Sequence, residues 1–143
     1  LLFFTGITRS ADTILGEQTA NIAERLPQLG QLRDLAGEAA TGLRDGDVNA
    51  LGTALNKSWQ AKRALASGVS NPQIDHMVEA ALAAGATGAK VTGAGGGGFL
   101  LVVCPLERQR AVREQLAPMK ELPINIEPFG SRVVLNVHRD IWG

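Results

Sequence analysis

The feature of this sequence that most restricts its fold is the segment Gly-Ala-Gly-Gly-Gly-Gly at positions 93–98. Glycine loses more conformational freedom on folding than any other residue, so a dense glycine run is costly inside a strand or helix. The segment therefore predicts a connection, and the residues at 89–92 and 99–104 predict the two strands that it joins. Two arrangements could offset the entropic cost. One is a close backbone crossing without a ligand, and the other is a set of bare N–H groups that converge on an anion.

The remaining periodicity predicts an α+β fold. Residues 1–5 form an apolar run typical of a strand that is buried on both faces. Helical spacing predicts helices at about 11–26, 29–43, 48–65, 72–84 and 105–117, and alternation predicts strands at 122–126 and 133–137. Ser10 and Asp47 are candidate caps for the first and third helices, and Ser70 with Gln73 is a candidate capping box for the fourth. Without the extra helices, the order is βαββαβ, the split-βαβ or ferredoxin-like arrangement. We therefore predict a mainly antiparallel sheet with helices on one face and additional helices.

Composition excludes several classes of partner. Lys and Arg number 14, as do Asp and Glu, so the chain carries no formal net charge and predicts neither a nucleic-acid nor a membrane-surface partner. Four Phe, two Trp and no Tyr are few for a base-stacking platform. The apolar run at 99–104 is too short to span a membrane. A single cysteine excludes an internal disulfide and favours a reducing, cytoplasmic location.

Several segments resemble one kinase superfamily. Residues 88–98, Gly-Ala-Lys-Val-Thr-Gly-Ala-Gly-Gly-Gly-Gly, look like the third conserved motif of the GHMP kinases, which include galactokinase, homoserine kinase, mevalonate kinase and phosphomevalonate kinase. Residues 4–10 resemble the start of the C-terminal domain in that superfamily. The segments 55–63 and 70–75, with Phe99 after the glycines, look most like the branch that phosphorylates D-glycero-D-manno-heptose 7-phosphate. The resemblance covers essentially the whole chain.

The resemblance implies that residues 1–143 are a fragment, the C-terminal domain of such a kinase. The family's Pro-x-x-x-Gly-Leu-Gly-Ser-Ser-Ala phosphate loop and its catalytic carboxylate belong to an N-terminal ATP-binding domain, and this sequence contains neither. We therefore expect no catalytic residue, no metal ligand and no kinase turnover in this fragment alone. ATP and Mg²⁺ would be held mainly by the N-terminal domain, which becomes a partner. An apolar face left by the missing interface would favour self-association.

The resemblance also assigns a phosphate and substrate loop. In the family, the third motif lines the cleft beside the phosphate loop and helps to shape the triphosphate and acceptor site. On this chain the corresponding positions are Gly93, Ala94, Gly95, Gly96 and Gly97. Lys90 and Thr92 flank this loop on one face of the preceding strand, because alternate residues share a face. They are candidates for reaching a phosphate, and a structural role explains them equally well.

A second group of candidate substrate residues consists of Thr5, Gly6, Arg9 and Lys62. Arg9 lies at the start of a predicted helix, where helix amides and a guanidinium group together would bind the acceptor phosphate. The alternative is a strand end followed by a helix cap, which alone explains Gly6 and Ser10. Lys62 shares a helix face with Trp59 at a spacing of three residues. We expect Trp59 in the core, and Lys62 is a candidate contact for the sugar phosphate.

Other polar residues carry no signal for chemistry. His76 and His138 have no metal-ligand spacing with cysteine or carboxylate residues, so we expect both to be structural or solvated. Cys104 ends a predicted strand, where inert packing is the usual role.

Three functions remain open at this point. The first is half of an ATP-dependent kinase that transfers the γ-phosphoryl group to the anomeric hydroxyl of D-glycero-D-manno-heptose 7-phosphate in carbohydrate metabolism. The second is another GHMP kinase, acting on galactose, homoserine or a mevalonate derivative. The third is a ferredoxin-like module that binds a ligand or dimerises without catalysis, because this fold also serves such roles.

Overall fold

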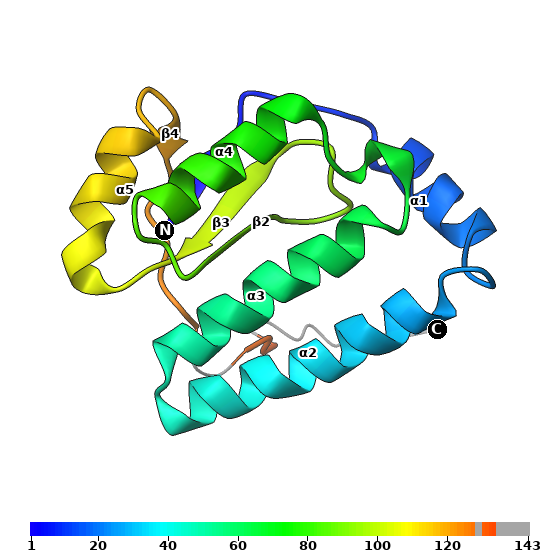
Figure 1. Ribbon diagram of the computed structural model, residues 1–143, viewed down its shortest axis with the longest axis horizontal. Coiled ribbons are helices and arrows are strands. Elements are labelled where there is room, and N and C mark those ends of the chain that lie inside the picture. Colours follow the sequence, from blue (N-terminus) through cyan, green and yellow to red (C-terminus); the bar gives the residue numbers. More distant parts are fainter. Residues whose placement is uncertain (128–129, 134–143) are drawn as a thin grey trace, which may run out of the picture.

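The computed structural model describes residues 1–127 and 130–133 of the 143-residue chain. In this part of the chain, four strands form one antiparallel sheet with the order β2-β3-β1-β4 (Figure 1). The strands are β1 (Leu2–Phe4), β2 (Gly88–Val91), β3 (Phe99–Val103) and β4 (Lys120–Glu121). The central pair β1 and β3 comes from distant parts of the sequence, as the ferredoxin-like topology requires.

Two helical segments complete the βαββαβ unit and cover one face of the sheet. Helix α4 (Pro72–Ala83) connects towards β2, and the short helices η2 (Leu106–Arg108) and α5 (Gln109–Gln115) lie between β3 and β4. Ile74 and Val112 from these helices join Phe3 and Leu100 from the sheet in one buried cluster. The predicted α+β, ferredoxin-like fold is therefore confirmed.

The other face of the sheet is only partly covered by described residues. Phe3 is buried, whereas its neighbours Leu2 and Phe4 point to the opposite face and are half-buried. Leu101 pairs with Leu2 and is also half-buried. The prediction that residues 1–5 are buried on both faces is thus wrong, because α4 and α5 pack against one side only.

Three further helices precede the βαββαβ unit's first helix. They are α1 (Ala11–Ala20), α2 (Leu26–Asp45) and α3 (Val48–Arg63), and the short helix η1 (Ser67–Val69) follows them. The single helix predicted at 11–26 is interrupted after Ala20. Pro27 lies in the first turn of α2, where a missing N–H is tolerated. Asn21 donates its side-chain amide to the carbonyl of Leu65 and anchors the intervening turn.

The helices α2 and α3 form a long antiparallel hairpin beside the sheet (Figure 1). The carboxylate of Asp47 accepts a hydrogen bond from the amide of Ala50 and so caps α3, as the sequence predicts. Helix α3 then lies against β2 at a very close approach. A Cβ atom on Gly88 would come within 2.7 Å of the carbonyl carbon of Gly52, so the absence of side chains here lets the helix and strand touch.

The start of α4 and the last predicted strands differ from expectation. Asn71, not Ser70, caps α4, since its side-chain oxygen accepts from the amide of Ile74. Only Lys120–Glu121 pairs as a strand, so the predicted strand at 122–126 is wrong. The predicted strand at 133–137 lies mostly outside the described residues, as does His138. No helix of the described part is long and apolar enough to span a bilayer.

Candidate functional site

The segment 93–98, called the glycine loop below, joins β2 to β3. Gly93, Gly95, Gly96 and Gly98 all have a positive φ, between 70° and 108°, which side chains rarely adopt. The amide of Gly96 donates to the carbonyl of Val69, and the amide of Gly98 donates to the carbonyl of Ile7, each at 2.8 Å. The loop is therefore held between η1 and the segment that follows β1.

Close packing on this inner side explains part of the glycine content. A Cβ atom on Gly96 would lie 2.8 Å from the carbonyl oxygen of Gly68, and one on Gly97 would lie 2.9 Å from the carbonyl carbon of Ile7. Both glycines are buried. The ligand-free alternative, a close backbone crossing, thus accounts for these two positions. The sequence did not identify Ile7, Gly68 or Val69 as the contacts of the loop, because nothing local marks a distant backbone partner.

The outer side of the loop is open. Gly93 is exposed, and Ala94 and Gly95 are half-buried. The amides of Ala94, Gly95 and Gly97 make no hydrogen bond to any other described residue. These three residues line a depression of about 210 Å³, together with Gly98, Thr8, Arg9, Ala11 and Thr92. Backbone N–H groups that face an open depression can bind an anion.

Arg9 adds a positive charge to this depression. Its side chain is exposed and makes no ion pair with a described carboxylate. Ser10, the N-cap residue of α1, makes no side-chain hydrogen bond to the helix. The first turn of α1 therefore also presents amides that its cap does not satisfy, next to Arg9. Guanidinium groups and helix N-terminal amides are both donors that bind phosphoryl oxygens.

Two of the candidate hydroxyl groups are used within the protein. Thr5 is buried, and its hydroxyl donates to the carbonyl of Gly98 at 2.9 Å and accepts from the amide of Ile7 at 3.2 Å. The hydroxyl of Thr92 donates to the carbonyl of Phe99 at 3.3 Å. In the described contacts, these side chains position the two ends of the glycine loop. Gly6 is exposed with a φ of 73°, at the turn after β1.

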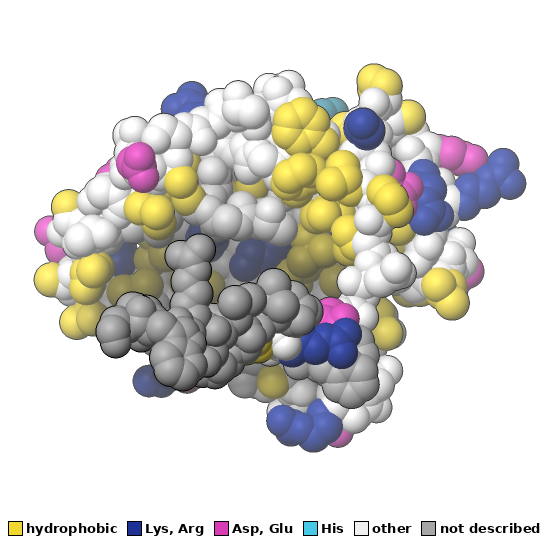
Figure 2. Space-filling model, turned by 180° about the vertical axis from the view of Figure 1, so that it is seen from behind, with side chains coloured by type: hydrophobic (Ala, Val, Ile, Leu, Met, Phe, Trp, Pro, Cys, Tyr) yellow, Lys and Arg dark blue, Asp and Glu magenta, His cyan; other side chains and the backbone are white. Residues whose placement is uncertain are grey.

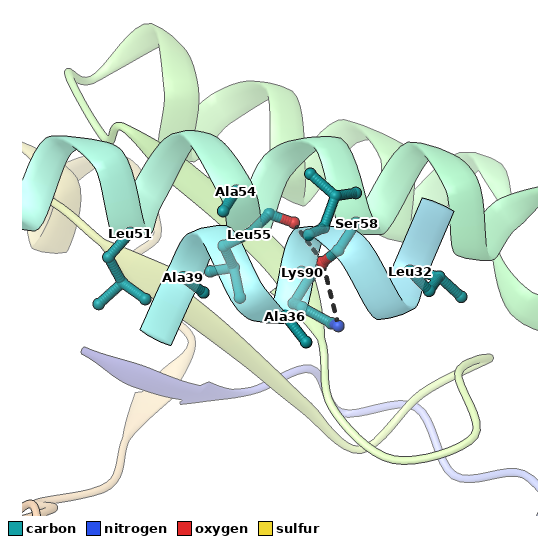
Figure 3. Close-up of a pocket in the computed structure, with 9 residues that line it drawn as sticks. Leu32, Ala36, Ala39, Leu51, Ala54, Leu55, Ser58 and Lys90 are labelled. Carbon is teal, nitrogen blue, oxygen red and sulfur yellow. Dashed lines mark hydrogen bonds between the residues drawn. The ribbon is translucent and has the colours of Figure 1, made fainter. Parts of the chain in front are cut away.

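Lys62 and Lys90 lie on the α3 side of the loop. The ammonium group of Lys62 donates a hydrogen bond to the carbonyl of Gly93. The ammonium group of Lys90 donates to the hydroxyl of Ser58 at 3.3 Å, and Ser58 donates in turn to the carbonyl of Leu55 at 2.8 Å (Figure 3). Lys90 therefore points towards α3, whereas Thr92 lines the depression with Arg9.

Lys90 and Ser58 are the polar residues of an otherwise apolar pocket of about 330 Å³ between α2, α3 and β2. Figure 3 shows the side chains that the two helices contribute on either side of Lys90. Seen from behind, the molecule is hollowed, and hydrophobic side chains lie there beside Lys or Arg side chains (Figure 2). The apolar lining residues are Leu32, Leu35, Ala36, Ala39, Leu51, Ala54 and Leu55.

Burial alters the acidity of both ammonium groups. Burial, with a further contribution from the charge of Lys90, lowers the pKa of Lys62 to about 8. Burial also lowers the pKa of Lys90. Neither lysine forms an ion pair with a carboxylate in the described part of the chain. The two cations are thus partly desolvated without a counter-ion there, an arrangement that is unfavourable unless an anion joins them.

The remaining described residues that the sequence analysis considered show no sign of a binding or catalytic role. Trp59 is fully buried, as predicted for a core residue. His76 is exposed on α4. Cys104 is buried, and burial raises the pKa of its thiol, which disfavours a reactive thiolate. Within residues 1–127 and 130–133, no group of three His, Cys, Asp or Glu side chains is placed to hold a metal ion.

Comparison with known proteins identifies related sequences. Residues 39–120 match the family described as "GHMP kinases C terminal". The chain is 32% identical over 117 residues to the L-fucokinase/L-fucose-1-P guanylyltransferase of Bacteroides fragilis. This match covers 79% of this chain and 12% of that protein. It is 30% identical over 102 residues to the D-glycero-alpha-D-manno-heptose 7-phosphate kinase of Campylobacter jejuni, covering 70% of this chain and 30% of the kinase.

A solved structure has the same fold. The crystal structure of L. major mevalonate kinase in complex with R-mevalonate superimposes with a TM-score of 0.70 at 24% sequence identity. The match covers 80% of this chain and 36% of the kinase chain. The chain therefore spans about a third or less of the length of the curated relatives named above, at 12% and 30%.

Proposed function

The chain belongs to the GHMP kinases, as a C-terminal domain of that family, and we propose that it forms one wall of the catalytic cleft of a sugar-phosphate kinase. The observation that carries this proposal is the depression where Arg9 meets the unpaired amides of Ala94, Gly95 and Gly97. Phosphoryl transfer depends mainly on positioning and on electrostatic stabilisation by such donors. Family membership favours a kinase over the non-catalytic ferredoxin-like module.

The acceptor in this proposal is D-glycero-D-manno-heptose 7-phosphate. Its support is the similarity to the Campylobacter jejuni kinase and the resemblance of the segments 55–63 and 70–75 to that branch. The γ-phosphoryl group would pass from ATP to the anomeric hydroxyl, ADP would leave, and the hydroxyl proton would go to a base outside this chain. The enzyme would act in the cytoplasm.

The residues present fit a phosphoryl group and leave other tasks to the rest of the kinase. Arg9 and the loop amides are donors for phosphoryl oxygens, with Arg9 the candidate for the acceptor phosphate. Thr5, Gly6 and Thr92 would position these donors. We propose that an N-terminal domain supplies the catalytic carboxylate, most contacts to ATP and the ligands of Mg²⁺, which neutralises phosphate charge when bound.

A second candidate function is another sugar kinase of the family. The similarity to the Bacteroides fragilis fucokinase covers 79% of the chain, more than the 70% covered by the heptose kinase. A panel of fucose, galactose, homoserine, mevalonate and heptose 7-phosphate, tested on the complete kinase, separates these functions. The heptose proposal expects the highest kcat/KM for heptose 7-phosphate, and a higher value for another acceptor would contradict it.

The cleft assignment is tested by Arg9→Gln in the complete kinase. A charge-assisted hydrogen bond contributes about 1.5–3 kcal/mol, so we expect kcat/KM to fall by about tenfold or more. Arg110→Gln is the matched control, because Arg110 is an exposed arginine on α5 whose side chain is 91% accessible. An Arg9→Gln enzyme that keeps the kcat/KM of the control would place the cleft elsewhere.

A further inference from the structure

The ammonium groups of Lys62 and Lys90 occupy neighbouring positions on one side of α3. Lys90 contacts Ser58, and Ser58 and Lys62 are four residues apart on the helix, which places them on one face. The charge of Lys90 acts on Lys62 directly. Lys62 in turn contacts Gly93, the first residue of the glycine loop. Lys62 thus lies beside the loop, Lys90 lies on the same face of α3 as Lys62, and neither lysine lines the Arg9 depression.

We propose that Lys62 and Lys90 form a second anion subsite, which binds the dianion of a phosphate monoester next to the glycine loop. This inference rests on the proposed kinase function and specifies how its substrate is recognised. Like charges without a counter-ion repel each other, and a dianion between them would neutralise both. No carboxylate pairs with either lysine in the described part of the chain.

The two lysines donate hydrogen bonds that a bound phosphate can replace. Each ammonium group now donates to an uncharged oxygen, the Gly93 carbonyl or the Ser58 hydroxyl. A charged acceptor forms stronger hydrogen bonds than these neutral ones, so a phosphate can replace them. Lysine suits this exchange because its ammonium is a point charge on a flexible stem.

The subsite is tested by phosphate binding in the complete kinase. Titration calorimetry with inorganic phosphate compares Lys62→Met and Lys90→Met with Lys57→Met. All three are made in an Arg9→Gln background, which removes the guanidinium group of the depression. Methionine keeps an apolar stem without the charge. Lys57 is the matched control, since it is an exposed lysine on the same helix, 56% accessible and 3.8 Å from Glu38.

We expect about tenfold weaker phosphate binding for each of the two variants and no change for the control, because each variant loses a charge-assisted hydrogen bond. Urea unfolding checks that the variants fold, and Lys62→Arg should retain binding. Equal phosphate affinity in all three methionine variants would overturn the subsite.

Steady-state kinetics of the same variants, with Arg9 intact, identify the source of the phosphate. A raised KM for the phosphorylated acceptor alone assigns the subsite to the acceptor, and a raised KM for ATP alone assigns it to the nucleotide. If the complete kinase turns over heptose 7-phosphate while the variants bind phosphate normally, the subsite fails and the proposed function stands. If the kinase shows no turnover with any acceptor while the variants lose phosphate binding, the proposed function fails and the subsite stands.

Discussion

Lys62 and Lys90 show how packing changes the chemistry of single residues. An exposed lysine keeps a pKa near 10.5, whereas burial and the charge of Lys90 lower the pKa of Lys62 to about 8. Between these values the unfolded chain binds more protons at this position than the folded chain does. Stability therefore rises with pH across that window, and below pH 8 the folded state carries the full cost of the buried charge.

We predict that Lys90→Met raises the pKa of Lys62, since the substitution removes a neighbouring positive charge. NMR titration of the lysine side-chain carbons, between pH 7 and pH 11, measures this value in the wild type and the variant. Lys57→Met serves as the control and should leave the pKa unchanged. A wild-type Lys62 that titrates near 10.5 would show that the side chain is not desolvated.

A second prediction at this scale concerns Gly97. Its Cβ position lies against the backbone of Ile7, which cannot move aside like a flexible side chain. We expect Gly97→Ala to lower the free energy of unfolding by about 1–3 kcal/mol, the usual cost of overpacking. Gly30→Ala is the control, because that glycine lies within α2 with open space around it, and the change should stabilise by up to about 1 kcal/mol.

Urea denaturation of both variants measures these differences. If Gly97→Ala proves as stable as the wild type, the loop does not pack against Ile7 as described.

At the scale of elements, the start of α4 is held by contacts that the sequence predicts only in part. Pro72 occupies the first turn, and Asn71 supplies the cap. The sequence instead suggests a capping box formed by Ser70 and Gln73, but the hydroxyl of Ser70 donates to the carboxylate of Asp75 at 2.6 Å. Arg63 on α3 pairs with the same carboxylate at 2.9 Å. The start of α4 is therefore tied to α3 as well as capped.

We predict that Asn71→Ala lowers the free energy of unfolding by about 0.5–2 kcal/mol, because the amide of Ile74 loses its acceptor. Asn71→Asp should preserve most of the stability, since aspartate is an equally good cap. Chemical denaturation followed by circular dichroism measures both. A larger loss for Ser70→Ala than for Asn71→Ala would contradict this assignment of the cap.

For the molecule as a whole, the sheet has two unlike faces. One is buried under α4 and α5, and the other carries half-buried apolar residues. Phe4 and Phe99 are paired on that second face, with ring centroids 5.4 Å apart. Since the chain spans only part of the length of its relatives, we propose that a further domain of the kinase completes the cleft. In its absence, the partly covered face would favour self-association.

We predict that the 143-residue chain alone releases no ADP from ATP with heptose 7-phosphate, because half of the proposed cleft is absent. A coupled assay for ADP measures this, with the complete kinase as the positive control. Sedimentation velocity on the same sample reports whether the chain self-associates. Turnover by the isolated chain at the rate of the complete kinase would contradict the proposal that an N-terminal domain supplies the catalytic carboxylate and most contacts to ATP.

The sequence by itself determined the order of elements and most of their positions. Asp47 predicted the cap of α3, Trp59 the core, and the glycine loop a connection between two strands, and all three are confirmed. These features depend on contacts within a few residues or on the period of apolar side chains, so the information is local. The superfamily was also recognisable from its motif, and the family match confirms it.

Only the tertiary structure decided what surrounds the loop. The carbonyls of Ile7 and Val69 accept its amides across long stretches of chain, and no local pattern marks such partners. The same holds for Lys90, which points to Ser58 although the sequence placed it with Thr92. Hydrogen bonds and charges between distant segments arise from how helices and strands pack together. The position of each hydrogen-bond donor at the site therefore depends on the tertiary packing of the whole domain.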